Sequence, residues 1–124
     1  MNTEIIEVIE SNSRWELYEG IQECQNLARF IKEFGYYPAL TGSVLYHGSS
    51  QKDLDILVYP HHAPSPVMSF ADLWLEIIKY YNPKAYGFAG TGKAYEGVRY
   101  LIKQSEQRID FFFCDFITEM DKYV

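Results

Sequence analysis

Two aspartates within an apolar stretch are the residues of this sequence that most directly suggest chemistry. Asp53 and Asp55 flank Leu54 and are followed by Ile56–Tyr59, a run that is typical of a buried β-strand. Because side chains alternate along a strand, both carboxylates lie on one face, about 7 Å apart along the strand. Two like charges at this spacing repel each other and raise both pKa values unless a cation compensates them. Mg²⁺ suits such hard oxygen ligands and can take substrate phosphates as well.

A third acid in similar apolar surroundings extends this pattern. Asp110 lies between two apolar residues within the predicted strand Arg108–Cys114. If that strand neighbours the strand of Asp53 and Asp55, the three carboxylates form one site that can hold two metal ions, an arrangement that promotes in-line displacement at phosphorus. Asp115 is the alternative third acid, and the sequence favours Asp110 because Asp115 lies beyond the strongest apolar run.

A glycine and a serine precede the aspartates at a short distance. Gly42 and Ser43 follow the predicted strand Pro38–Thr41, and nine residues separate Ser43 from Asp53. Glycine lets the backbone approach an anion closely. Backbone N–H groups and the Ser43 hydroxyl can then hold the phosphates of a nucleotide beside the metal ions.

Further candidates for phosphate contacts are four basic side chains: His47, Lys93, Arg99 and Arg108. His47 opens the predicted loop His47–Lys52, where exposure to solvent is the common state of a histidine. The predicted loop Gly87–Lys93 is not a P-loop, because Ala94 replaces the serine or threonine that binds Mg²⁺ and a helix precedes it. The two arginines are expected to pair with carboxylates of this acidic chain, although either could contact phosphate.

The order and spacing of these residues resemble the DNA polymerase β-like nucleotidyltransferase superfamily. Its signature is a hydrophobic residue with Gly-Gly or Gly-Ser, then about nine to thirteen residues, then Asp-hydrophobic-Asp/Glu-hydrophobic, with a third acid on a later strand. The matching segments are Leu40-Thr41-Gly42-Ser43, Asp53-Leu54-Asp55-Ile56 and Ile109-Asp110-Phe111. The resemblance extends over roughly residues 15–115.

This resemblance implies Mg²⁺-dependent transfer of a nucleoside monophosphate from a nucleoside triphosphate (NTP) such as ATP to an acceptor, with release of pyrophosphate. It implies that Asp53, Asp55 and Asp110 bind metal and serve catalysis, and that Gly42 and Ser43 bind triphosphate. In size the chain is similar to minimal nucleotidyltransferases, including antitoxin-type members that modify a partner protein. The acceptor is expected to be a protein or a hydroxyl of RNA or a small molecule. The alternative is a catalytically silent nucleotide-binding or antitoxin-like regulatory module that acts through a protein partner.

Two amphipathic helices are predicted to cover the strands. The first spans Trp15–Phe34, begins with a capping box between Ser13 and Glu16, and ends at Gly35. The second spans Pro66–Tyr81, with proline at its first position. Each helix presents one apolar stripe, which predicts that both pack on a sheet.

The last two strands, Val98–Ile102 and Arg108–Cys114, are close enough in sequence to form an antiparallel hairpin. The predicted order is helix, strand, strand, helix, strand, strand. It describes an α+β fold, a small mixed β-sheet with helices packed on it. The resemblance identifies this as a single nucleotidyltransferase-like domain over residues 1–124.

Length and charge restrict the functional class. The chain has 124 residues, of which 48% are hydrophobic, enough for one domain with a core. The net charge of −6 argues against extended nucleic-acid binding, which relies on basic surfaces. A bound cation can still invert the local field at a nucleotide site. Little chain remains to recognise an acceptor, so a homo-oligomer or a protein partner is expected to contribute.

Cysteine usage and hydropathy point to the cytoplasm. Cys24 and Cys114 are far apart and belong to no metal-binding motif, as is typical of reduced cysteines in a cytosolic protein. The acidic N-terminal segment does not resemble a signal peptide. A membrane-spanning helix needs about 18 consecutive apolar residues, and no apolar run of this sequence is that long, so no membrane association is expected.

Overall fold

The structure is a computed structural model that describes residues 14–61, 68–89 and 98–114. Its elements are β1 (Trp15–Glu16), α2 (Leu17–Ile31), a 3₁₀ turn (Lys32–Phe34), β2 (Tyr36–Thr41), α3 (Gly42–His47), β3 (Ser49–Ser50), β4 (Asp53–Pro60), α4 (Phe70–Tyr81), β5 (Ala85–Ala89), β6 (Val98–Ile102) and β7 (Arg108–Phe113). Five strands form one sheet in the order β2-β4-β7-β6-β5. β4 and β7 are parallel and the other neighbours are antiparallel, so the predicted α+β class with a mixed sheet is confirmed.

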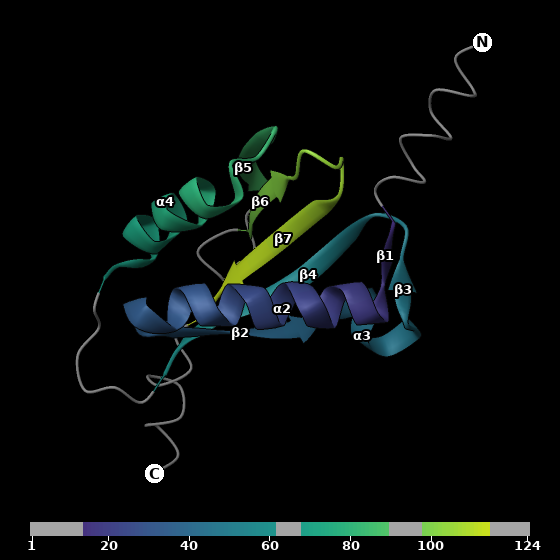
Figure 1. Ribbon diagram of the computed structural model, residues 1–124, viewed down its shortest axis with the longest axis horizontal. Coiled ribbons are helices and arrows are strands. Elements are labelled where there is room, and N and C mark those ends of the chain that lie inside the picture. Colours follow the sequence, from purple (N-terminus) through teal and green to yellow (C-terminus); the bar gives the residue numbers. More distant parts are fainter. Residues whose placement is uncertain (1–13, 62–67, 90–97, 115–124) are drawn as a thin grey trace.

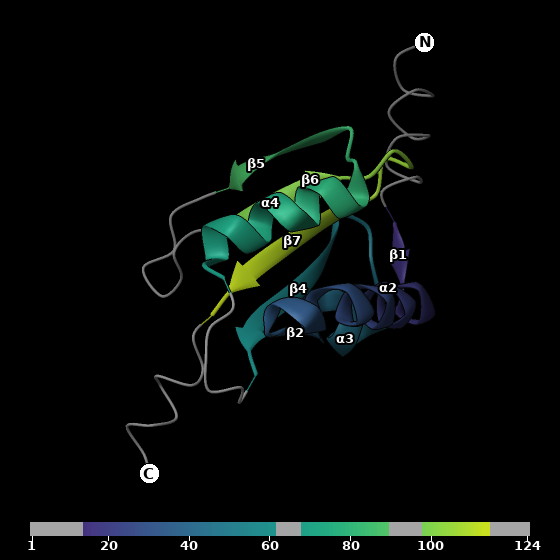
Figure 2. The ribbon, with the colours of Figure 1, turned by 60° about the vertical axis from the view of Figure 1, so that its left-hand side comes forward.

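Both long helices pack on the same face of this sheet (Figures 1 and 2). α2 lies along β2 and β4, and α4 lies beside β6 and β7. The indole of Trp74 on α4 meets the ring of Phe111 on β7 at 5.6 Å between centroids. Fully buried Leu27 and Ile31 anchor α2 in the same core.

Alternation along the central strands separates the core from the opposite face. Leu54, Ile56 and Val58 of β4 are completely buried with Ile109 and Phe111 of β7. Because side chains alternate along a strand, the aspartates at the start of β4 point away from this core. The helices therefore cover one face of the sheet while the acids lie on the other.

The first helix begins later than predicted. Trp15 and Glu16 form β1, which pairs with Ser49 and Ser50 of β3 in a separate two-stranded sheet. α2 starts at Leu17, and its first turn is capped because the Glu16 N–H donates a 3.0 Å hydrogen bond to the Glu19 carboxylate. The predicted capping box with Ser13 lies partly outside the described residues, and Glu16 takes a different place in the cap.

The second helix is also shorter at its start. α4 begins at Phe70, where the hydroxyl of Ser69 accepts a 3.2 Å hydrogen bond from the Asp72 N–H. Pro66, the predicted first residue, lies outside the described residues, and the described helix starts later than predicted because Ser69 supplies the cap. The predicted end holds, since Asn82 closes the helix in a left-handed conformation at φ 45°.

Two segments predicted as loops form regular structure. His47 is the last residue of α3, not the first residue of a loop, and Gly48 ends this helix at φ 81°. Gly87 lies within β5, which pairs with β6, while residues 90–93 of the predicted loop lie outside the described residues. The antiparallel hairpin of β6 and β7 is confirmed. Among the described helices, none is long and apolar enough to cross a membrane.

Candidate functional site

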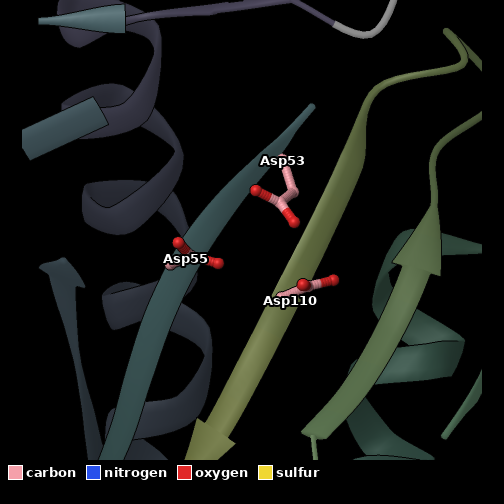
Figure 3. A group of neighbouring side chains, drawn as sticks. All are labelled: Asp53, Asp55 and Asp110. Carbon is pink, nitrogen blue, oxygen red and sulfur yellow. The ribbon is translucent and has the colours of Figure 1, made fainter. Parts of the chain in front are cut away.

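The parallel pairing of β4 and β7 brings the three predicted acids together. Asp55 lies directly opposite Asp110 in this pair, and Asp53 lies opposite Arg108. One carboxylate oxygen from each of Asp53, Asp55 and Asp110 lies within 4.8 Å of the others (Figure 3). The expectation that these strands are neighbours is confirmed. We call this group the acidic triad.

Gly42 fits tightly against the acidic triad. It follows β2 at φ +72°, a conformation that glycine adopts readily and other residues rarely do. A Cβ atom at this position would lie 2.1 Å from Asp55 Oδ2. The first residue of α3 therefore forms a wall of the site, and any larger residue would push the Asp55 carboxylate aside.

Burial and mutual repulsion disfavour the charged forms of two triad members. Burial is the largest cause that raises the pKa of Asp53 to about 7, and a hydrogen bond with Asp110 adds to it. The charges of Asp55 and Asp110 raise this pKa further. Burial and then the charge of Asp110 raise the pKa of Asp55 to about 6. Arg108 acts on both groups in the opposite direction.

Arg108 is a cationic side chain that contacts the triad. Its Nε donates a 2.8 Å hydrogen bond to Asp110 Oδ1. Its guanidinium carbon lies 4.5 Å from the centre of the Tyr100 ring, within range of a cation–π interaction. Tyr100 in turn lies over Gly87 of β5, where an added Cβ would meet the Tyr100 hydroxyl at 3.2 Å. The arginine is thus fixed from two sides.

The donor set of the triad fits a hard divalent cation. Three carboxylates supply oxygen ligands. The raised pKa values of Asp53 and Asp55 mean that nearby positive charge would favour their ionised forms. The wall at Gly42 keeps Asp55 directed into the group.

Among solved structures, 25 chains are similar to this one. No protein-family model matches the chain, and no curated protein matches it. A solved structure of a cytoplasmic RNA terminal U-transferase is similar at a TM-score of 0.49 and 14% sequence identity. The match covers 78% of this chain but only 28% of that one. A likeness at this level does not place the chain in a family.

Three other residues are predicted to bind phosphate: Ser43, His47 and Lys93. Ser43 is exposed in the first turn of α3, directly after Gly42. His47 is exposed at the opposite end of this helix. Lys93 lies outside the described residues, as does Asp115, the alternative third acid. The roles of these residues in binding a nucleotide stay predictions.

The two arginines have different surroundings. Arg108 pairs with a carboxylate as expected, whereas Arg99 is 7% exposed and packs between the rings of Phe88 and Phe113, 5.2 and 4.7 Å from their centres. The contact between Arg108 and Asp110 has a local signal in the sequence, because their i, i+2 spacing on one strand places both side chains on the same face. The stacking on Tyr100 required the strand order, which no local pattern contains.

Proposed function

We propose that this chain is a divalent-metal-dependent nucleotidyltransferase that moves a nucleoside monophosphate from an NTP to an acceptor. The observation that carries the proposal is the convergence of Asp53, Asp55 and Asp110 beside Gly42. Gly42 and Ser43 at the start of α3 and the acids also match the sequence pattern of the polymerase β-like superfamily.

The triad would hold the metal, with Mg²⁺ as the expected ion. When bound, the metal supplies polarisation of the phosphate oxygens and neutralises charge that develops during displacement. Asp53, Asp55 and Asp110 each offer a carboxylate oxygen for this purpose. Arg108 orients Asp110 through its 2.8 Å hydrogen bond, so that this acid presents a defined direction to the site.

Residues of the chain would bind the triphosphate and remove the proton of the acceptor. The backbone at Gly42 and the hydroxyl of Ser43 would bind the β- and γ-phosphates and leave the α-phosphorus facing the triad. The acceptor oxygen attacks that phosphorus, an O–P bond forms, and the bond to the bridging oxygen breaks, so that pyrophosphate leaves. Asp110 would take the proton of the acceptor hydroxyl as general base.

The acceptor belongs to one of three classes: a protein, an RNA end or a small molecule with a hydroxyl group. A protein partner or a second copy of the chain would contribute to its recognition. A location in the cytoplasm would give access to each of these acceptors and to Mg²⁺ and NTPs.

The test is incubation of the full chain with each α-³²P-labelled NTP and Mg²⁺, followed by measurement of released pyrophosphate and of transferred label. We expect transfer with wild type and loss of at least about 100-fold in Asp53→Asn or Asp55→Asn, since metal and charge stabilisation commonly supply several kcal/mol. Asp72→Asn is the matched control, because Asp72 is an exposed acid of α4.

Three outcomes separate the functional classes. Transfer that depends on the triad supports the enzyme. Metal-dependent NTP binding without transfer to any offered acceptor contradicts the catalytic proposal in favour of the silent module. Absence of both binding and transfer contradicts a nucleotide function altogether.

A further inference from the structure

Arg108 meets the acidic triad at Asp110 and is held there by several contacts. Its Nε bonds to Asp110, its guanidinium stacks on Tyr100, and its backbone carbonyl accepts a 2.8 Å hydrogen bond from the Trp15 indole. Across the strand pair it lies opposite Asp53. A side chain fixed in this way contributes a constant positive charge, because the guanidinium does not lose its proton at physiological pH.

The charge balance of the site follows from this arrangement. Three ionised carboxylates and one guanidinium carry a net charge of −2. One divalent cation neutralises that charge. A second divalent cation would leave the site positive, and in a half-buried environment such an excess is strongly unfavourable.

Arg108 also occupies one oxygen of the triad. Asp110 Oδ1 accepts the hydrogen bond from Nε, and the Asp110 side chain is only 11% exposed. A cation that needed this oxygen would have to displace a guanidinium that is stacked on Tyr100. The net charge of the site and the occupied oxygen of Asp110 therefore both disfavour a second cation.

We propose that Arg108 limits the acidic triad of the free protein to a single tightly bound divalent cation. This inference rests on the proposed function, because it takes the triad as a metal site. A second ion then requires additional negative charge, which the phosphates of a bound nucleotide carry. Arg108 is in this sense a positioning residue, since it acts through Asp110 and through the charge of the triad.

The test is a titration of the metal-free full chain with Mn²⁺ alone at about pH 8, where carboxylates are ionised. Free Mn²⁺ is counted by electron paramagnetic resonance. We expect one tight ion per wild-type chain. In Arg108→Gln we expect a second ion to bind. Its affinity should be at least about tenfold higher than any second-site affinity of wild type, because the guanidinium charge that repels a second cation has been removed.

Two variants make this result specific. Arg108→Lys keeps the charge and should retain one tight ion. Arg29→Gln removes the same charge from an exposed position of α2, on the helical side of the sheet, and should match wild type. Circular dichroism verifies that each variant is folded.

The outcomes distinguish this inference from the proposed function. A second ion in Arg108→Gln alone supports the inference. Equal stoichiometry and affinity in wild type and Arg108→Gln, or two tight ions in wild type, overturn it while the metal site stands. No Mn²⁺ binding by wild type overturns both the inference and the metal-dependent function.

Discussion

Asp53 combines the largest number of unfavourable influences on a charged group in this site. Burial, a hydrogen bond with Asp110 and the charges of two carboxylates all raise its pKa, which reaches about 7. The sequence alone predicts part of this effect, because Asp53 and Asp55 share a strand face. The share that comes from Asp110 depends on a strand pair that only the folded chain contains.

Neutralisation of Asp53 should stabilise the metal-free protein. In Asp53→Asn the repulsion among the triad carboxylates decreases while the shape of the side chain is kept. In excess EDTA at about pH 8 we expect the thermal midpoint to rise by roughly a few degrees. Glu33→Gln is the control, since Glu33 is exposed in the 3₁₀ turn and its replacement should change stability by less than about 0.5 kcal/mol. An equal or lower midpoint for Asp53→Asn contradicts the repulsion.

The raised pKa of Asp53 also predicts a pH dependence of stability. In the unfolded chain an aspartate loses its proton near its ordinary pKa of about 3.9. In the folded chain Asp53 keeps its proton up to about pH 7. Between these values the folded state binds more protons, so the free energy of unfolding of the metal-free protein falls as pH rises. The stability that protonated Asp53 contributes is fully present below the pKa of the unfolded chain. It is lost as the pH rises through the pKa of the folded chain.

Urea unfolding in EDTA at a series of pH values measures this effect, and the difference between wild type and Asp53→Asn isolates it from other groups. We expect the wild type to lose stability relative to the variant across the window from about pH 4 to pH 7. A difference that is independent of pH would contradict the raised pKa.

At the scale of elements, the junction of β2 and α3 at Gly42 determines how Asp55 is directed. Gly42 and Gly48 are matched in conformation, at φ +72° and +81°, but differ in surroundings. A Cβ at Gly42 would meet Asp55 Oδ2 at 2.1 Å, whereas a Cβ at Gly48 would meet nothing within 4 Å. The two glycines therefore separate backbone strain from a steric clash with the triad.

Gly48→Ala should cost about 1 kcal/mol of stability through its left-handed backbone alone. Gly42→Ala should cost about 1–3 kcal/mol more and should weaken divalent-cation binding, because the new methyl group displaces the Asp55 carboxylate. Chemical denaturation and Mn²⁺ titration of both variants measure these effects. If the two variants lose equal stability and both bind Mn²⁺ as wild type does, the close contact between Gly42 and the Asp55 carboxylate does not shape the site.

Short elements are where the sequence was least informative. β4 and β7 were predictable, because each is a run of apolar residues long enough to define a buried strand. β1 was not, because its two residues are extended only through pairing with β3, more than thirty positions away. α3 was missed for a related reason, since six residues give too little periodicity to recognise, although Gly48 marks its end.

At the scale of the whole molecule, the site depends on a crossover. Asp55 and Asp110 lie opposite each other only because β4 and β7 are parallel neighbours, and α4, β5 and β6 all intervene in the chain. The sequence supplied the residues of the site and left their proximity conditional on this topology. Any ligand that bridges the two strands must therefore stabilise the complete fold rather than one segment.

Binding of a metal-bound nucleotide should accordingly raise the thermal midpoint of the whole chain. A ligand that binds only the folded state contributes about 2.7 kcal/mol at a concentration of one hundred times its dissociation constant. For a chain of this size, we expect a shift of roughly ten degrees with Mg²⁺ and the preferred NTP, and a smaller one with Mg²⁺ alone. Asp55→Asn should abolish the nucleotide-dependent part, because Asp55 on β4 and Asp110 on β7 lie opposite each other and would together hold the metal of the proposed function. An undiminished shift in Asp55→Asn would place nucleotide binding elsewhere on the chain, since no ligand bridging these strands could be indifferent to the loss of that carboxylate.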